Sequence, residues 1–193
     1  MELTFATNNR NKINEVLPLL NNRARIVSLK EIGCKEELPE TGDTLEANAK
    51  QKAKYVYDKY RVNCFADDTG LKVRALNGRP GVLSARYAGP DQNAEMNMSK
   101  LLSELKGHTD RSAIFKTVIY LIINKKQYLF EGNIYGTILT EKRGKNGFGY
   151  DPIFQPAGYD HSFAEMNLED KNRISHRAAA IKKLAEFLNS IKD

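Results

Sequence analysis

Cysteine is scarce in this chain of 193 residues, and its scarcity argues against two kinds of protein. Cys34 and Cys64 lie far apart and form no CxxC pair, so we expect ordinary thiols of a reducing compartment and neither a disulfide framework nor a zinc site. Long apolar runs are also missing: no stretch reaches the length of a transmembrane helix, and the chain starts on a strand-like segment without the pattern of a signal peptide. We therefore expect a cytoplasmic protein with no membrane partner.

Internal repeats, low-complexity linkers and the GxxxxGK[ST] spacing of a P-loop are absent as well. The composition that remains, 41% hydrophobic and 28% charged, is typical of a globular protein and predicts a single domain over residues 1–193. Thirty basic against 24 acidic residues give a net charge of +6, which favours an anionic partner. The basic residues are dispersed and match no nucleic-acid-reading motif, so we expect no nucleic acid among the partners.

The order of strand and helix patterns predicts the fold class. Apolar residues with helical spacing cover residues 13–20, 43–60, 91–105 and 171–188, and the second of these helices has Asp43 as its expected N-cap. The predicted strands are residues 3–7, 25–28, 62–66, 113–123, 127–131 and 134–139. Strands and helices alternate first and a run of strands follows, which predicts a mixed α/β fold with α+β character.

Two adjacent carboxylates, Asp67 and Asp68, follow the predicted strand 62–66 and precede an expected Thr-Gly turn. Successive side chains of a strand point to opposite faces, so only one of the two can face a given cleft. One interpretation is a solvated turn rich in Asp and Gly. The other is a carboxylate held at a strand end, beside an arginine-containing loop, to bind a metal or to activate water.

The polar loop Thr7–Lys12 and Lys52 are further candidates. The loop joins a strand to a helix, which places backbone N–H groups and the positive helix end where an anion can bind, although many such loops bind nothing. Lys52 lies inside the apolar stripe of its helix. It is either a lysine that snorkels from the edge of the stripe or a partner for an anionic group in the same cleft.

Two C-terminal segments offer contacts for a base. The loop Phe148–Asp151 sets aromatic rings and a carboxylate among glycines, which suits base stacking and equally an ordinary Gly/Pro turn. If Ser175 caps the last helix, His176 and Arg177 crowd its positive end. That arrangement favours donation to an acceptor-rich ligand, and an exposed basic turn is the alternative.

Five blocks of the sequence together resemble the inosine triphosphate pyrophosphatase family, which hydrolyses deaminated purine nucleoside triphosphates. The blocks are TNNRNK at 7–12, PETGDTLEANAKQKA at 39–53, ADDTGL at 66–71 with PGVLSARYAG after it, FGYDPIF at 148–154 and SHRAAA at 175–180. They keep the order of the family and span nearly the whole chain. Asn8, Arg79 and Leu83 depart from the residues common in the family, which affects only the expected shape of the local loops.

The resemblance implies an elongated two-lobed α/β protein with a central cleft, a homodimer that uses Mg²⁺ and converts ITP, dITP or XTP to the monophosphate and pyrophosphate. It implies Asp68 as the base and a magnesium ligand, and Glu40 as the second ligand. The residues implied to bind the triphosphate are Thr7, Asn8, Asn9, Arg10, Asn11, Lys12, Lys52 and Thr69. Those implied to bind the base are Phe148, Gly149, Tyr150, Asp151, Lys171, His176 and Arg177.

Physical chemistry is consistent with these roles. Asp68 would orient a metal-polarised water at the α-phosphorus. Hypoxanthine and xanthine present a C6 carbonyl to donors from His176 and Arg177, whereas adenine would leave those donors unpaired, a mismatch that can discriminate by roughly 10⁴-fold or more. Guanine also has the carbonyl, so its rejection must arise at the 2-position. A non-catalytic nucleotide sensor is the competing interpretation, and the presence of Asp68 with Lys12 argues against it.

Overall fold

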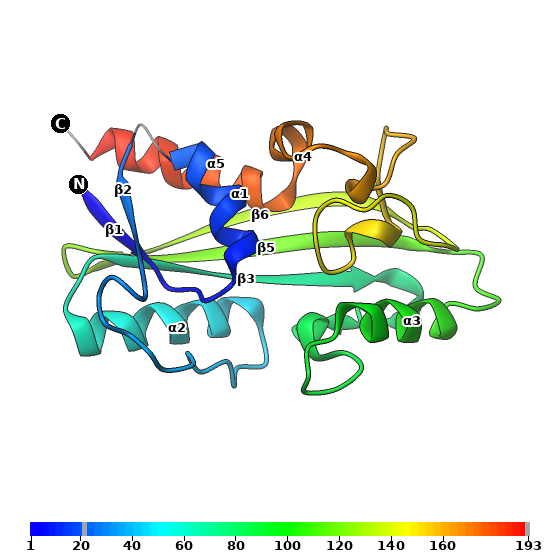
Figure 1. Ribbon diagram of the computed structural model, residues 1–193, viewed down its shortest axis with the longest axis horizontal. Coiled ribbons are helices and arrows are strands. Elements are labelled where there is room, and N and C mark those ends of the chain that lie inside the picture. The colour runs from blue at the N-terminus through cyan, green and yellow to red at the C-terminus, as the bar shows by residue number, and fades with distance from the viewer. Residues whose placement is uncertain (21–22, 192–193) are drawn as a thin grey trace. The chain divides into compact units, whose positions relative to one another are not determined.

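The structure is a computed structural model that describes residues 1–20 and 23–191. The strands are β1 (Glu2–Phe5), β2 (Arg25–Ser28), β3 (Cys64–Val73), β4 (Pro80–Gly81), β5 (Ser112–Ile123), β6 (Lys126–Ile138) and β7 (Phe154–Pro156), and the helices are α1 (Arg10–Leu20), α2 (Leu45–Tyr60), α3 (Ala94–Glu104), α4 (Leu168–Ile174) and α5 (His176–Ser190) (Figure 1). The sheet order is β2-β1-β3-β5-β6-β7, with β4 paired to β3. Parallel and antiparallel pairs both occur, so the predicted mixed α/β class is confirmed.

The chain divides into two compact units, which we describe separately. Unit 1 comprises Met1–Asp68, Thr117–Gly132 and Arg177–Asp193, and unit 2 comprises Thr69–Lys116 and Asn133–His176. Each unit has its own hydrophobic core. The single domain, the elongated shape and the central cleft expected from the sequence stay predictions.

Unit 1 is built on parallel strand pairs. β1 pairs with β2 from Glu2↔Arg25 to Phe5↔Ser28, and it pairs with β3 at Phe5↔Phe65, where the two rings stack 4.5 Å apart. These rings belong to a core that α1 and α5 complete on one face of the strands. Helix α2 lies on the other side of β3 (Figure 1), where the Cys64 thiol donates to the Ala53 carbonyl at 3.3 Å.

Helix α2 begins one residue later than predicted. The N-cap is Thr44 and not Asp43, because Thr44 has the extended backbone of a cap and its hydroxyl accepts from the Ala47 N–H at 3.1 Å. The helix ends where Arg61 takes a left-handed conformation at φ 55° and donates its N–H to Tyr57. Between these caps α2 buries one face that includes Asn48 and Lys52.

Strand β3 runs for ten residues, and the predicted Thr-Gly turn after Asp68 does not form. Thr69 and Gly70 stay in the strand because β3 continues into pairs with β4, Leu71↔Gly81 and Lys72↔Pro80. The Asp-Asp-Thr-Gly composition favours a turn locally, but the backbone ladder and burial of the strand override that preference.

In the C-terminal half, the expected hairpin is present. Asn124 and Lys125 have φ values of 49° and 64°, as a two-residue turn between β5 and β6 requires. β6 is one continuous strand where the sequence predicted two, and residues 132–133 do not interrupt it. Its pairing with β7 at Gly136↔Pro156 brings the backbones so close that a Cβ on Gly136 would lie 2.3 Å from the Gln155 carbonyl oxygen.

The predicted final helix is two helices. α4 ends at Ile174 and α5 starts at His176, so the single helix predicted here is wrong. The extended Ser175 between them is the C-cap of α4 and directly precedes the first residue of α5, which is the N-cap position that the sequence suggested for it. Ile174 consequently packs against the core of unit 2, whereas Ile181 packs in the core of unit 1. Among residues 1–20 and 23–191, no helix combines the length and the apolar character needed to cross a membrane.

Candidate active site

The two adjacent aspartates of β3 have different partners, as strand alternation predicts. The Asp67 carboxylate accepts from Lys12 Nζ at 2.8 Å and from Arg177 Nε at 3.1 Å, and its residue is 1% exposed. The Asp68 carboxylate is instead directed toward α2, where Asn48 Nδ2 donates to Oδ2 at 3.2 Å and Lys52 Nζ lies 3.7 Å from Oδ1. The interpretation of this stretch as a solvated turn is therefore wrong.

Arg177 is completely buried in unit 1. Its guanidinium binds Asp67 through Nε and Glu15 through Nη1, so α5, β3 and α1 are joined by one chain of charges. The alternative of an exposed basic turn is wrong for both His176 and Arg177, which are 3% and 1% exposed. The role of Arg177 in a base pocket stays a prediction, and the contacts that are seen are to carboxylates.

Lys52 is a buried ion-pair partner and not a snorkelling lysine. Its ammonium donates to Glu40, donates to the Asp67 carbonyl at 2.7 Å and approaches Asp68. Glu40 comes from the irregular segment before α2, so Lys52 brings that segment and β3 to the same place. The predicted cation site and the predicted phosphate-binding lysine thus share one cluster in unit 1.

Burial and neighbouring charges shift the pKa values in this cluster in different directions. Burial alone would raise the pKa of Asp67, but Lys12, Arg177 and Lys52 outweigh burial and hold it well below its ordinary value. Burial alone would lower the pKa of Lys52, but Asp68, Glu40 and Asp67 reverse that effect. Burial raises the pKa of Asp68 despite the attraction of Lys52 and Lys12, and repulsion from Glu40 acts in the same direction.

The loop Thr7–Lys12 is stabilised by its own side chains. Asn9 Oδ1 accepts from the N–H groups of Asn11 at 3.0 Å and Lys12 at 3.2 Å, so Asn9 caps α1, while Thr7 Oγ1 accepts from the Asn9 N–H. Asn8 and Arg10 are exposed. Lys12 is the member of this loop that reaches the charge cluster, and contacts of the other members with phosphate stay predictions.

Asp68 and Glu40 together could provide two carboxylate ligands for one Mg²⁺ ion. Both carboxylates meet the same Lys52 ammonium, so they lie close enough to act on one cation. Within the described residues, no group of three or more His, Cys, Asp or Glu side chains could hold a metal ion. Mg²⁺ commonly takes one or two carboxylates and completes its shell with waters and substrate phosphates, so this donor set fits that ion when a phosphate is bound.

In unit 2, the predicted base-binding residues also come together. Asp151 Oδ2 accepts from the Phe148 N–H at 2.8 Å and from Lys171 Nζ at 2.5 Å, and both charged side chains are buried. The Lys171 ammonium lies 5.0 Å from the centre of the half-buried Phe148 ring. Gly147 must lack a side chain, because a Cβ there would lie 2.1 Å from Asp151 Oδ2.

Three other predicted residues of unit 2 have distinct surroundings. Tyr150 is part of the hydrophobic core and donates its hydroxyl to the Ser84 carbonyl at 2.9 Å, whereas Gly149 takes a left-handed φ of 64° beside it. The His176 ring stacks on Phe115 at 4.6 Å. Thr69, the next residue of β3 after Asp68, is half-buried, and its contact with phosphate stays a prediction.

Sequence reasoning missed Asn48 and Glu15. Asn48 binds Asp68, and the available signal was its position one helical turn before Lys52 inside the block 39–53. Glu15 binds Arg177, and the signal was its position three residues after Lys12. Both were overlooked because a polar residue on a predicted helix is ordinarily solvent-exposed.

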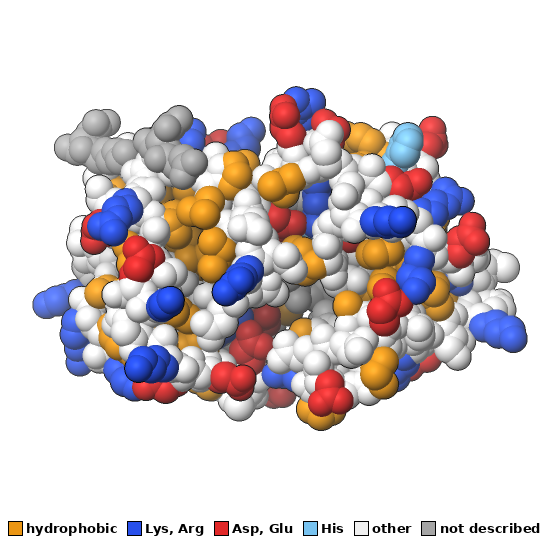
Figure 2. All heavy atoms as spheres, viewed as in Figure 1, with side chains coloured by type: hydrophobic (Ala, Val, Ile, Leu, Met, Phe, Trp, Pro, Cys, Tyr) orange, Lys and Arg blue, Asp and Glu red, His pale blue; other side chains and the backbone are white. Residues whose placement is uncertain are grey.

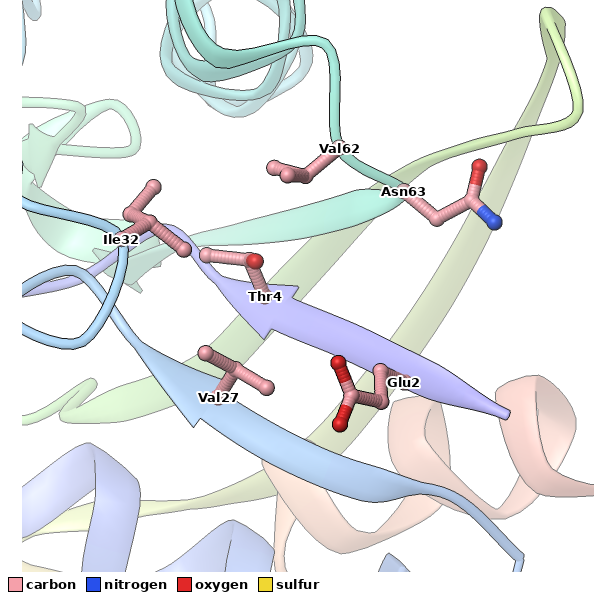
Figure 3. Close-up of a pocket in the computed structure, with 6 residues that line it drawn as sticks. All are labelled: Glu2, Thr4, Val27, Ile32, Val62 and Asn63. Atoms are coloured by element: carbon pink, nitrogen blue, oxygen red, sulfur yellow. The ribbon is translucent and has the colours of Figure 1, made fainter.

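A separate small hollow in unit 1 contains none of the predicted site residues (Figure 3). Its volume is about 180 Å³, and it is lined by Glu2, Thr4, Val27, Ile32, Val62 and Asn63. Figure 2 shows basic and acidic side chains interspersed over the visible face, without one continuous basic patch. The candidate active site is therefore the buried charge cluster and not this hollow.

Known proteins resemble this chain both in sequence and in structure. The model of the Ham1 family matches residues 3–187. A protein of Flavobacterium psychrophilum named dITP/XTP pyrophosphatase is 55% identical over 190 residues, covering 98% of this chain and 100% of the relative, and one of Porphyromonas gingivalis with the same name is 54% identical, covering 97% of each. Solved structures of Ham1 proteins from Coxiella burnetii and Staphylococcus aureus have TM-scores of 0.91 and 0.89 at 36% and 39% identity, each covering 98% of this chain and 99% of that structure.

Proposed function

The chain belongs to the Ham1 family, and from that premise we propose that it hydrolyses deaminated purine nucleoside triphosphates to the monophosphate and pyrophosphate. Relatives that share half of its residues over their full length are named dITP/XTP pyrophosphatases, so dITP, ITP and XTP are the proposed substrates. The observation that carries the proposal is the buried cluster of unit 1, in which Lys12 and Lys52 meet Asp67, Asp68 and Glu40. Such a cluster suits chemistry on a polyanion.

Each charged residue has a distinct proposed role. Lys12 and Lys52 attract the triphosphate, and their ammonium groups are held in place by ion pairs with Asp67 and Glu40. Asp67 is the structural partner of Lys12 and Arg177, and its low pKa keeps it ionised. Asp68 is the base that orients the attacking water and takes up its proton.

Mg²⁺ is the proposed cofactor, with Asp68 and Glu40 as its ligands from the protein. When bound, the ion would neutralise phosphate charge and lower the pKa of a coordinated water. Asn48 and Lys52 keep the Asp68 carboxylate in place, and the segment before α2 supplies Glu40.

For unit 2 we propose recognition of the base. Phe148 offers a ring face, and the pair Asp151 and Lys171 fixes the loop that carries it through the Phe148 N–H and the ring contact of Lys171. His176 is held by stacking on Phe115, so its ring has a defined orientation. A homodimer in the cytoplasm is the expected setting.

A substrate panel tests the proposed function. Purified protein with Mg²⁺ should release pyrophosphate from ITP, dITP and XTP at least about 100-fold faster, in kcat/KM, than from ATP or GTP. Adenine leaves the donors that fit a C6 carbonyl unpaired, whereas guanine has that carbonyl and is distinguished by its 2-amino group. The products are separated by ion-exchange chromatography, which distinguishes pyrophosphate from orthophosphate. Release of orthophosphate, or equal rates on all five nucleotides, would refute the proposal.

A second experiment tests the base. Asp68→Asn should lower kcat by at least about 1,000-fold while ITP still binds, since general-base catalysis and cation binding are lost together. The matched control is Asp58→Asn, which removes an exposed aspartate that pairs with Lys54 on the outer face of α2 and should leave kcat unchanged. Near-normal turnover of Asp68→Asn would show that another group is the base.

A further inference from the structure

Asn48 binds the Asp68 carboxylate in unit 1, and we propose that it is a positioning residue that fixes the orientation of that carboxylate. This inference rests on the proposed function, because it concerns the residue assigned there as the base. Asn48 is 1% exposed and is placed by the first turns of α2. It brings a neutral amide to a charged carboxylate.

Both ends of the Asn48 amide are bonded. Its Nδ2 donates to Asp68 Oδ2 at 3.2 Å, and its Oδ1 accepts from the Gly42 N–H at 2.7 Å. The acceptor bond to a backbone N–H fixes which end of the amide is the oxygen, so the donor must point at Asp68. Asn48 therefore cannot rotate by half a turn without losing both bonds.

The two oxygens of Asp68 are thereby distinguished. Oδ2 is held by Asn48, while Oδ1 lies 3.7 Å from Lys52, one helical turn further along α2. Two contacts from one helix define the plane of the carboxylate more strictly than either contact alone. A carboxylate with a fixed plane presents one defined lone pair to the reacting water, which is what Asn48 supplies.

Asn48 also links Asp68 to the segment that carries Glu40. Gly42 approaches α2 so closely that a Cβ on it would lie 2.7 Å from Ala47 Cβ and 3.0 Å from Asn48 Oδ1. Glu40 stands two residues before Gly42 in the same segment. One amide side chain thus sets the separation between the two carboxylates that we assign to the cation.

Asn48 also anchors the segment before α2, and Gln51 anchors the same segment from the same helix. Gln51 therefore provides a matched control for anchoring alone. Gln51 Oε1 accepts from the Thr41 N–H at 2.9 Å, and its Nε2 donates to Thr41 Oγ1 at 2.9 Å. Gln51 thus anchors the same segment by two hydrogen bonds to Thr41, and it is not among the contacts of Asp68. Loss of anchoring alone is therefore measured by Gln51→Leu.

The experiment compares Asn48→Asp, Asn48→Leu and Gln51→Leu with the wild-type protein on ITP. Asn48→Asp keeps the acceptor for the Gly42 N–H and loses the donor to Asp68. We expect kcat to fall by about 10-fold to 100-fold in both Asn48 variants, because each loses the hydrogen bond that orients the charged Asp68 carboxylate. KM for ITP should stay within about threefold in Asn48→Leu, and Gln51→Leu should keep kcat within about threefold.

Two measurements that do not depend on turnover accompany the kinetics. The melting temperature shows whether each variant is folded. The affinity for ITP in EDTA should be unchanged in the neutral variant Asn48→Leu, because the phosphate-binding lysines keep their partners, whereas the carboxylate added beside Asp68 in Asn48→Asp should weaken it. If Asn48→Leu fails to fold, the kcat of Asn48→Asp alone decides whether the proposal stands.

The proposal is overturned if Asn48→Asp keeps kcat within about twofold of the wild type, or if Gln51→Leu loses as much kcat as Asn48→Asp. Failure of the proposed function would appear differently, as absence of pyrophosphate release by the wild-type protein. The two failures are therefore distinguishable.

Discussion

Replacement of Arg177 by methionine tests the buried charge network most directly. Arg177→Met keeps a long side chain of similar reach and removes the guanidinium between Asp67 and Glu15, all three of which are buried. Asp67 retains Lys12 as a partner, and Glu15 loses its ion pair with Arg177. The variant therefore removes one positive charge from beside two buried carboxylates.

The expected cost follows from burial of that charge. Removal of one partner of a buried pair typically destabilises a protein by about 3–5 kcal/mol. In a protein of this length, each kcal/mol lowers the melting temperature by about 2–4 °C. We therefore expect Arg177→Met to melt about 6–20 °C below the wild type, with the lower part of the range favoured if Glu15 takes up a proton.

Thermal unfolding followed by circular dichroism, with urea unfolding beside it, measures this loss. The control is Arg25→Met: Arg25 pairs with Glu2 and Glu31, but its side chain is 65% exposed, so the expected cost is at most about 1 kcal/mol. The double variant Glu15→Gln/Arg177→Met should regain part of the lost stability, because the buried charge of Glu15 is gone. The reasoning fails if Arg177→Met costs no more than Arg25→Met, or if Glu15→Gln adds a further loss.

Two further predictions concern acid and the base-binding loop. Because the pKa of Asp67 is lowered in the folded protein, its ion pairs contribute stability above its unfolded pKa of about 3.9, and that contribution is lost as the pH falls below that value. The free energy of unfolding of Asp67→Asn should thus approach that of the wild type as the pH falls from about 4 towards 2, and a constant gap in urea titrations over that range would contradict the assignment. Lys171→Met leaves Asp151 buried without its ammonium partner, so both the melting temperature and the affinity for ITP should fall, whereas exposed Lys72→Met should change neither. An Lys171→Met protein that binds ITP like the wild type would remove Lys171 from base recognition.

The order of elements was predictable because hydrophobic periodicity is a local property of the chain. Helix α2 was expected within one residue of its start, and β2 with its observed bounds. The errors lie where contacts between distant segments override local preference. Thr69 and Gly70 look like a turn but are held in β3 by β4, and residues 171–188 look like one helix but are divided at Ser175 into α4 and α5.

The residue types that carry the site could also be read from the sequence. Asp68, Lys12, Lys52, Asp151 and Lys171 were all identified from their positions in loops, in an apolar helix stripe and in the family blocks. Which carboxylate meets which cation could not be read, because ion pairs such as Lys12 with Asp67 join residues more than fifty positions apart. Asn48 was missed because a polar residue on a helix is ordinarily exposed, and its position one turn before Lys52 did not show that it meets Asp68, which lies twenty residues further along the chain.

The sequence by itself therefore determined the fold class and the family and supplied the candidate site residues, because periodicity and motif spacing are carried by neighbouring positions. Only the tertiary structure decided which carboxylate pairs with which cation. Alternation along β3 sends Asp67 to Lys12 and Arg177 and sends Asp68 to Asn48 and Lys52. Burial makes these pairings necessary, because a charge removed from water needs a partner. The fold determines which partner is within reach.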